Sequence, residues 1–439
     1  MSGHTSNGKL VAFVTMGCAK NEVDSDHMAL RLKAAGYAIG DDPEQADVVI
    51  VNTCSFIQAA TEESIEAVLE VAGYESVAKG DAHLVVAGCM PARYGDDLER
   101  EIPEASGFVS CAGESEIVAV VDRVLGFERT TGSPIALPVE GGFDCVSAYV
   151  KISDGCDRFC SYCTIPHIRG RYHSFPIGEI DAEIDRVSSC GAREIVLIAQ
   201  DTGRWGADFE EPSTLAELIT HVAERRPDLW FRVMYIQPEG VTDQFVEAVA
   251  VHDNVCNYFD IPFQHANVRI LKAMNRKGSA EEHLALIARV RERIPEATLR
   301  TTLIAGFPGE TDEDFAELCA FVEDADLDYI GVFPYSREEG TRAHDLDGQV
   351  DEDVKLVRTQ EVRDLADTVC SARIASRIGA EVDVLVCGCE EDGQLFGRAK
   401  SQAPDVDGVT YLDAGKPGDI VRVRIDDTLL YEMEGTVLS

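Results

Sequence analysis

Three closely spaced cysteines are the residues of this chain best suited to chemistry. Cys156, Cys160 and Cys163 lie in the stretch 151–171 with the spacing C-x3-C-x2-C. Three thiolates this close can turn toward one metal centre, whereas a zinc site usually has four ligands in two matched halves. A four-iron cluster held by three thiolates keeps one iron open for another ligand. This stretch offers no matched fourth ligand, so the sequence favours such a cluster over zinc. It is also too polar for three buried structural cysteines.

At these residues the chain resembles the radical S-adenosylmethionine (SAM) enzymes. In that superfamily cysteines at this spacing hold a 4Fe-4S cluster, and the open iron binds the amino and carboxyl groups of SAM. Tyr162 stands where those enzymes have an aromatic residue, which implies that its backbone lies beside the adenine. Gly306, in the segment TLIAGFPGET, belongs to a loop that lies beside SAM in the family, although a glycine pattern alone is a weak signal.

Three more cysteines follow predicted strands. Apolar runs at 9–16, 46–52 and 82–87 alternate with helical stretches, which predicts a parallel sheet. Because ligands bind at the carboxyl edge of such a sheet, the cysteines after these runs should meet there as a second cluster site. They are Cys18, Cys54 and Cys89. Two other cysteines are set aside as structural or incidental: Cys111, although a strand could end there too, and Cys145.

The segments around these cysteines resemble the methylthiotransferases, which are radical SAM enzymes with two clusters. The similar segments are VTMGCAKNEVDSD, VNTCSFI and VAGCMPARY. The resemblance implies that Cys18, Cys54 and Cys89 (the auxiliary trio) hold an auxiliary 4Fe-4S cluster. It also implies that Cys156, Cys160 and Cys163 (the radical trio) hold the cluster that cleaves SAM.

The chain is long enough for three domains. We expect an amino-terminal Rossmann-like α/β domain at 1–140, with a boundary at Gly141-Gly142, and a central domain at 141–378. Six predicted strand–helix units are too few for a closed eight-stranded barrel and suit an open partial (β/α)6 barrel, as the resemblance also implies. Five short strands at 379–439 predict a small antiparallel β-barrel that resembles the TRAM domain. The six central strands are expected at 148–152, 195–200, 231–236, 258–262, 299–305 and 329–333.

Polar residues after three central strands, at 200–202, 237–239 and 264–265, should point into the barrel mouth. His265 is either a hydrogen-bonded wall residue or a proton carrier. We assign no catalytic acid or base, because the C–H bond broken in these enzymes offers no acidic proton.

The composition limits the partners and the compartment. With 39 basic and 79 acidic residues the formal charge is −40, which argues against an extended nucleic-acid surface and favours a basic partner. An equal alternative is that the whole proteome of a salt-tolerant organism is rich in acidic residues.

The start of the chain lacks an apolar signal region, and no apolar run approaches the ~20 residues of a membrane span. Fourteen cysteines suggest metal chemistry in a reducing compartment. We therefore expect a cytoplasmic protein with no membrane partner.

Two methylthiotransferase subgroups compete for the substrate. One acts on an adenosine of transfer RNA, and the other on an aspartate of small-subunit ribosomal protein S-twelve. The segment from Gly379 onward contains five basic and thirteen acidic residues, and this negative charge disfavours binding of transfer RNA. The segments GCAKNEVDSD, PFQHANVRILK and GRAKSQAPDVDG also look more like the second subgroup. In the last of them, Asp405 and Asp407 are expected to be turn residues.

The resemblance to the second subgroup implies a mechanism. A low-potential donor such as a flavodoxin or ferredoxin reduces the radical cluster, SAM is cleaved, and the radical removes a hydrogen from the β-carbon of the aspartate. The auxiliary cluster supplies sulfur, which a second SAM methylates. The partner would be the ribosomal protein, free or on the ribosome. An iron–sulfur sensor or scaffold without turnover is the non-enzymatic alternative.

Overall fold

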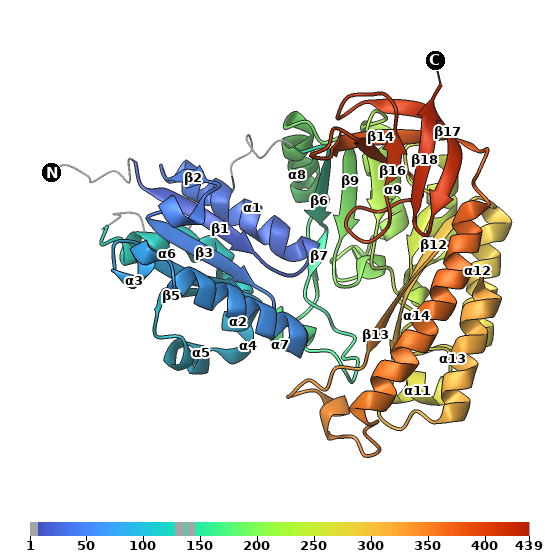
Figure 1. Cartoon of the computed structure of the whole chain (residues 1–439), viewed down its shortest axis with the longest axis horizontal. Helices are drawn as coiled ribbons and strands as arrows, with labels where there is room; N and C mark the ends of the chain where they lie inside the picture. The colour runs from blue at the N-terminus through green and yellow to red at the C-terminus, as the bar shows by residue number, and fades with distance from the viewer. Residues whose placement is uncertain (1–7, 128–136, 138–144, 439) are drawn as a thin grey trace.

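The structure is a computed structural model that describes residues 8–127, 137 and 145–438. An α/β layer, a curved barrel and a small β-barrel follow one another along the chain (Figure 1). The predicted boundary at Gly141-Gly142 lies outside the described residues. Within the described residues no helix is long and apolar enough to cross a membrane.

The amino-terminal part contains a parallel five-stranded sheet in the order β2-β1-β3-β4-β5. Its elements are β1 Leu10–Thr15, α1 Ala19–Ala34, β2 Ala38–Gly40, η1 Pro43–Gln45, β3 Val48–Thr53, α2 Gln58–Ala72, α3 Glu75–Ala78, β4 His83–Gly88, α4 Cys89–Tyr94, α5 Asp96–Glu101, β5 Ala105–Ser110, η2 Cys111–Glu116 and α6 Ile117–Val124. Alternate residues of β3 pack on opposite faces: Ile50 against α1 and α6, and Val51 against α2 and α4. Because helices cover both faces, the strands are continuous apolar runs. The three predicted strands are confirmed.

The central part is an open barrel of six parallel strands. Its elements are β6 Ser147–Lys151, β7 Ser153–Asp154, α7 Ile165–Ile168, β8 His173–Ser174, α8 Ile177–Ser189, β9 Glu194–Ile198, η3 Thr202–Arg204, α9 Leu215–Arg225, β10 Trp230–Val233, η4 Pro238–Gly240, α10 Asp243–Val251, β11 Tyr258–Asp260, α11 Val268–Ala273, α12 Ala280–Arg293, β12 Thr298–Ala305, α13 Asp312–Ala325, β13 Tyr329–Pro334, η5 Arg342–Asp345 and α14 Glu352–Ala375. The sheets β6-β9-β10 and β11-β12-β13 are joined by a bridge between Phe231 and Val255. The predicted partial barrel is confirmed, with strand ends shifted by a few residues.

The carboxyl-terminal part is a closed barrel in the order β14-β15-β16-β18-β17. Its strands are β14 Glu381–Cys389, β15 Leu395–Ala399, β16 Thr410–Leu412, β17 Ile420–Leu429 and β18 Glu432–Val437. The predicted five-stranded barrel is confirmed, but the pairing of β16 with β18 is parallel rather than antiparallel. Its core residues Leu385 and Val423 belong to the same buried cluster as Trp230 and Tyr258 of the central barrel. The small barrel is therefore packed onto the central one rather than tethered beside it.

Buried hydrogen bonds and ion pairs hold the small barrel against the central barrel. Glu194, which is 1% exposed, accepts hydrogen bonds from Arg232 at 2.8 Å and from Arg398 of β15 at 2.9 Å. The side chain of Asp407 is fully buried and accepts a hydrogen bond from the Tyr258 hydroxyl at 2.7 Å. Burial raises the pKa of Asp407 to about 6. Asp407 lies in a bend directly after the turn at 404–406, as expected, and in addition this loop contacts the central barrel.

We predict that Arg398→Ala loosens the docking of the small barrel. The change leaves Glu194 buried with one cationic partner fewer, which should cost roughly 1–3 kcal/mol. Trp230 packs at this interface, so the urea midpoint of its fluorescence change should fall. Arg424→Ala is the matched control, because Arg424 pairs with Asp426 on the surface. Equal midpoints for the two variants would show that the Glu194 contact does not hold the domains together.

Candidate functional site

The auxiliary trio lies at one edge of the amino-terminal sheet. Cys18 is the residue before α1, Cys54 follows β3 directly, and Cys89 begins α4 directly after β4. Because β1, β3 and β4 are neighbours in the sheet, their carboxyl ends bring the three cysteines to the same edge. Cys18 is exposed, whereas Cys54 and Cys89 are buried.

Gly17 allows Cys18 and Cys54 to approach each other. Its φ is +96°, and a Cβ at this position would lie 2.5 Å from the Cβ and 2.9 Å from the Sγ of Cys54. Only glycine accepts that backbone conformation and that contact without displacing the Cys54 thiol.

The thiols at this edge shift one another's pKa values in opposite directions. The neighbouring thiols of Cys111 and Cys54, together with the nearby Arg169 guanidinium, lower the pKa of Cys89 to about 3. The same contacts, with burial, raise the pKa of Cys54 and of Cys111. The edge is thus already suited to hold a thiolate, which is the form that binds metal.

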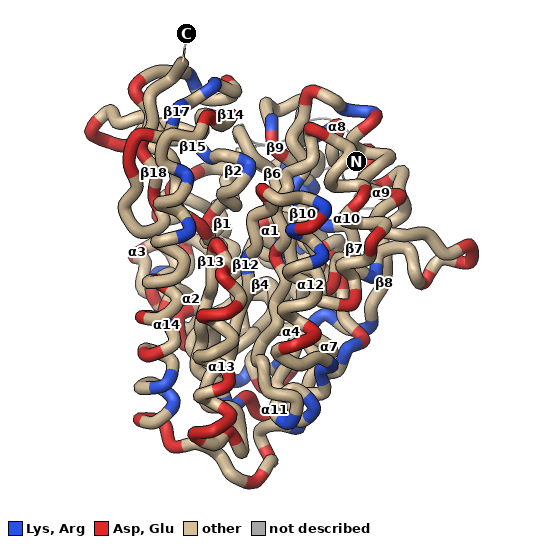
Figure 2. The backbone as a smooth tube through the Cα atoms, turned by 90° about the vertical axis from the view of Figure 1, so that its right-hand side faces the viewer, with Lys and Arg blue, Asp and Glu red and all other residues tan. Residues whose placement is uncertain are grey.

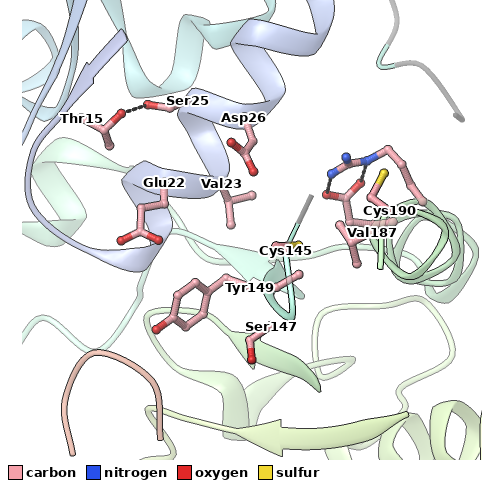
Figure 3. A pocket seen from close by; sticks show the side chains of 13 residues that line it. Thr15, Glu22, Val23, Ser25, Asp26, Cys145, Ser147, Tyr149, Val187 and Cys190 are labelled. Carbon is pink, nitrogen blue, oxygen red and sulfur yellow. Dashed lines mark hydrogen bonds and ion pairs between the residues drawn. The ribbon is translucent and has the colours of Figure 1, made fainter. Parts of the chain in front are cut away.

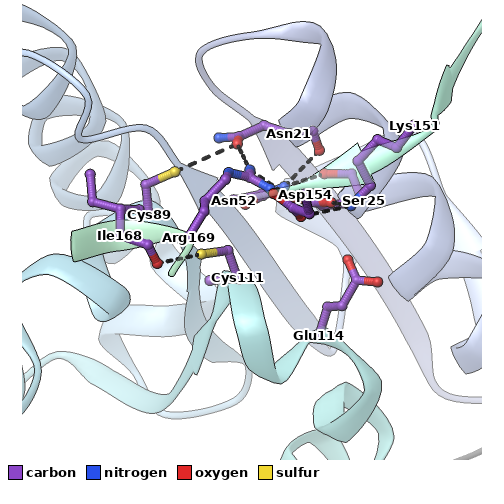
Figure 4. Close-up of polar contacts among 12 residues, drawn as sticks. Asn21, Ser25, Asn52, Cys89, Cys111, Glu114, Lys151, Asp154, Ile168 and Arg169 are labelled. Atoms are coloured by element: carbon purple, nitrogen blue, oxygen red, sulfur yellow. Dashed lines mark hydrogen bonds and ion pairs between the residues drawn. The ribbon is translucent and has the colours of Figure 1, made fainter. Parts of the chain in front are cut away.

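Arg169 links this edge to the central domain (Figure 4). It donates hydrogen bonds to Asn21 and Asp24 of α1, both at 2.8 Å, and to Asp154 at 3.2 Å. Lys151 forms a second ion pair with Asp24. Burial alone would lower the pKa of Arg169, but Asp24 and Asp154 hold it well above its usual value.

The radical trio occupies the loop between β7 and α7. The loop is held by backbone hydrogen bonds from Ser161 to the Met274 carbonyl at 2.9 Å and from Ala343 to the Ser161 carbonyl at 2.7 Å. Arg276 approaches the Cys160 sulfur to 4.0 Å. Burial, followed by the neighbouring Cys160, raises the pKa of the Cys163 thiol.

The segments next to the two trios contact each other. Thr164, directly after Cys163, donates a hydrogen bond to the carbonyl of Phe56 at 3.0 Å, and Phe56 lies two residues after Cys54. Helix α4, which begins at Cys89, packs against α7. Farther out, Arg93 pairs with the buried Glu338 at 2.8 Å. The fold therefore places the auxiliary trio and the radical trio at one domain interface.

Two cavities border this interface. One, of about 280 Å³, is lined by Cys160, Cys163, Pro166, His167 and Arg342 among others, and so opens beside the radical trio. The other, also about 280 Å³, lies between α1, β6 and α8 (Figure 3). Glu22, Asp26, Cys145 and Cys190 are among its lining residues, and none of the six trio cysteines is.

The ligand chemistry fits iron–sulfur clusters. Among the described residues no group of three or more Cys, His, Asp or Glu side chains is arranged to hold a metal ion. A single zinc ion requires each sulfur ligand to lie about 2.3 Å from that one ion. In a four-iron cluster each thiolate binds a different iron, so the cysteine sulfurs are spread over the cluster. Each trio offers three soft thiolates, which are the ligands that iron–sulfur clusters take in proteins.

The polar residues after the central strands have different surroundings. His265 is fully buried, accepts a hydrogen bond from the Asn267 backbone at 3.0 Å and lies 3.3 Å from Glu310, which fits a wall residue. The side-chain oxygens of Gln200 and Gln237 are buried and make no hydrogen bond to another described group. Asp201 accepts a hydrogen bond from Arg158 at 2.6 Å.

Two residues are predicted to contact SAM. Tyr162 lies within the loop of the radical trio, and Gly306 lies on a neighbouring loop. Tyr162 packs against a buried cluster that includes Phe307, the residue after Gly306. Gly306 has φ +75°, and a Cβ there would lie 2.2 Å from the Lys355 Cγ. This glycine therefore has a packing role against α14, and its role toward SAM remains a prediction.

Sequence reasoning set Cys111 aside and did not single out Arg169 or Glu338. The structure places Cys111 directly after β5, as Cys89 directly follows β4. Arg169 and Glu338 had no local signal, because the partners that join them to the amino-terminal part, Asp24 and Arg93, are more than a hundred residues away in sequence.

The fold and the cysteine motifs define a radical SAM protein with a TRAM domain. Residues 10–110 match the uncharacterized protein family UPF0004, residues 150–322 the Radical SAM superfamily and residues 378–438 the TRAM domain. Two solved structures share the fold. The radical SAM methyltransferase TsrM from Kitasatospora setae is 15% identical, with a TM-score of 0.56 over 76% of this chain and 74% of that one. The cobalamin-dependent SAM radical enzyme OxsB is 12% identical, with a TM-score of 0.52 over 82% of this chain and 57% of that one.

Curated relatives are more specific. The chain is 40% identical to ribosomal protein uS12 methylthiotransferase RimO of Symbiobacterium thermophilum, over 97% of this chain and 90% of the relative. It is 41% identical to the protein of the same name from Pelotomaculum thermopropionicum, over 98% and 100%. The chain belongs to the ribosomal protein uS12 methylthiotransferase family.

We predict that Gly17→Ala removes the auxiliary cluster and spares the radical cluster. The added Cβ displaces Cys54, so iron and sulfide after anaerobic reconstitution should fall from about eight to about four of each per chain. Gly80→Ala is the control, because Gly80 has φ +78° with nothing within 4 Å of an added Cβ. Equal iron content in both variants would contradict the role given to Gly17.

Proposed function

We propose that this protein inserts a methylthio group at the β-carbon of an aspartate of ribosomal protein uS12. It does so with SAM and two 4Fe-4S clusters. The observation that carries the proposal is the 39–41% identity to curated uS12 methylthiotransferases over 97–99% of the chain. The two cysteine trios at one domain interface support it, because sulfur insertion requires the radical site and the sulfur source to reach the same carbon.

Cys156, Cys160 and Cys163 would hold the radical cluster, and Cys18, Cys54 and Cys89 the auxiliary cluster. When bound, the clusters and SAM supply the electron, the radical, the sulfur and the methyl group. Arg276 and Arg169 place cationic groups beside Cys160 and Cys89. Tyr162 and Gly306 are proposed to contact SAM.

The charges of the small barrel support a protein substrate over transfer RNA. Arg398 is paired with Glu194, Arg422 with Asp383 and Arg424 with Asp426. Lys400 lies over the Trp230 ring. These cations are used within the chain, so the barrel offers few of them to phosphate.

The acidic surface supports a basic partner. Acidic residues are spread over the outer helices and the small barrel (Figure 2), and the formal charge is −40. Such a surface attracts a lysine- and arginine-rich protein and speeds its binding. We also propose a low-potential flavodoxin or ferredoxin as electron donor, a cytoplasmic location, and domain limits at 1–140, 141–378 and 379–439.

We predict that deleting the gene removes one modification from uS12. Intact-mass analysis of ribosomal proteins should show uS12 lighter by one methylthio group less one hydrogen, and the wild-type gene should restore the mass. Nucleoside analysis of transfer RNA from the same strains is the control and should not change. An unchanged uS12 mass would exclude this substrate, and a lost transfer-RNA nucleoside would point to the alternative one.

We further predict a division of labour between the trios. Cys160→Ala should abolish reductive SAM cleavage by the reconstituted protein, because the radical cluster loses a ligand. Cys54→Ala should spare cleavage but stop methylthio transfer to a uS12 peptide. Cys389→Ala, at an exposed position, is the control for both. Loss of SAM cleavage in Cys54→Ala would contradict the separate roles of the clusters.

A further inference from the structure

A fourth cysteine, Cys111, shares the sheet edge with the auxiliary trio. It begins η2 directly after β5, and β5 is the neighbour of β4 in the sheet order β1-β3-β4-β5. Neighbouring strands lie about 4.8 Å apart. Cys54, Cys89 and Cys111 therefore follow three consecutive strands, with Cys89 in the middle.

The contacts of Cys111 are those of a site residue. Its side chain forms a small buried cluster with Cys89 and Ile168. Its thiol donates a hydrogen bond to the Ile168 carbonyl at 3.2 Å. Cys89 and Cys111 both lie beside the Arg169 guanidinium (Figure 4). Cys370, by contrast, belongs to the large apolar core of the central barrel, with the Tyr431 side chain beside it.

We propose that Cys111 is a fourth, displaceable ligand of the auxiliary cluster. The inference rests on the proposed function, because it requires a cluster on the auxiliary trio. The Cys111 thiol gives its proton to water, its sulfur binds the iron that the trio leaves open, and a bound water leaves that iron. No atom is oxidised or reduced in this exchange.

The Ile168 carbonyl makes the exchange reversible. When the incoming sulfur donor takes the iron, the Cys111 sulfur regains a proton and donates a hydrogen bond to this carbonyl, as in the structure. Cys111 then protects the open iron between turnovers, because a four-iron cluster with only three protein ligands loses that iron most easily on oxidation.

The test uses the full chain with the radical trio replaced by alanine, so that only the auxiliary cluster is present. This parent is compared with the same protein bearing Cys111→Ala, Cys111→Ser or, as a matched buried control, Cys370→Ala. Each is reconstituted anaerobically, its iron is counted, and it is then oxidised with a limited amount of ferricyanide. The yield of the three-iron cluster is read from its electron paramagnetic resonance (EPR) signal.

We expect the three-iron yield to rise at least threefold in Cys111→Ala and Cys111→Ser, and to stay at the parent's level in Cys370→Ala. The serine variant keeps a hydroxyl that can donate to Ile168, so it separates ligation from packing if the alanine variant folds poorly. A parent with about four irons whose yield is unchanged by both Cys111 substitutions would overturn this inference alone. A parent that binds no iron would overturn the auxiliary cluster itself, and with it the proposed function.

Discussion

The ion-pair network between Arg169, Asp24, Asp154 and Lys151 is the interaction on which the arrangement of the site depends. Asp24 belongs to α1, which begins directly after Cys18, whereas the other three flank the loop of the radical trio. Two buried cations face two carboxylates, so no charge is left without a partner. Removing one member of such a network is strongly destabilising, because the remaining charges stay buried. The network therefore fixes the sheet edge that holds the auxiliary trio against the loop that holds the radical trio.

The small barrel plays a structural part that its family resemblance does not suggest. Its residues Arg398 and Asp407 enter the central barrel and meet Glu194 and Tyr258 there. These contacts lie at the amino-terminal ends of two central strands, because Glu194 begins β9 and Tyr258 begins β11. Arg398 is paired in this way and is not available to bind phosphate.

The sequence was sufficient for features that depend on local pattern. Apolar runs predicted the strands of the first two parts, and the rule that ligands meet at carboxyl strand ends brought Cys18, Cys54 and Cys89 to one edge. The sequence was not sufficient to predict the role of a residue whose partner is distant in the chain. The segment around Asp407 predicted a turn, but only the structure shows that the Asp407 carboxylate accepts a hydrogen bond from Tyr258. Cys111 was set aside as structural or incidental although a strand could end there, because the sequence alone does not show that its thiol lies beside Cys89 and Arg169.

The central claim is that two iron–sulfur clusters lie close together across one domain interface. The most direct measurement is the EPR spectrum of the doubly reduced enzyme, compared with the sum of spectra from two variants that each lack one trio. The account predicts splitting or broadening in the intact enzyme that is absent from the sum, because two nearby spins interact. A spectrum equal to the sum would contradict the claim.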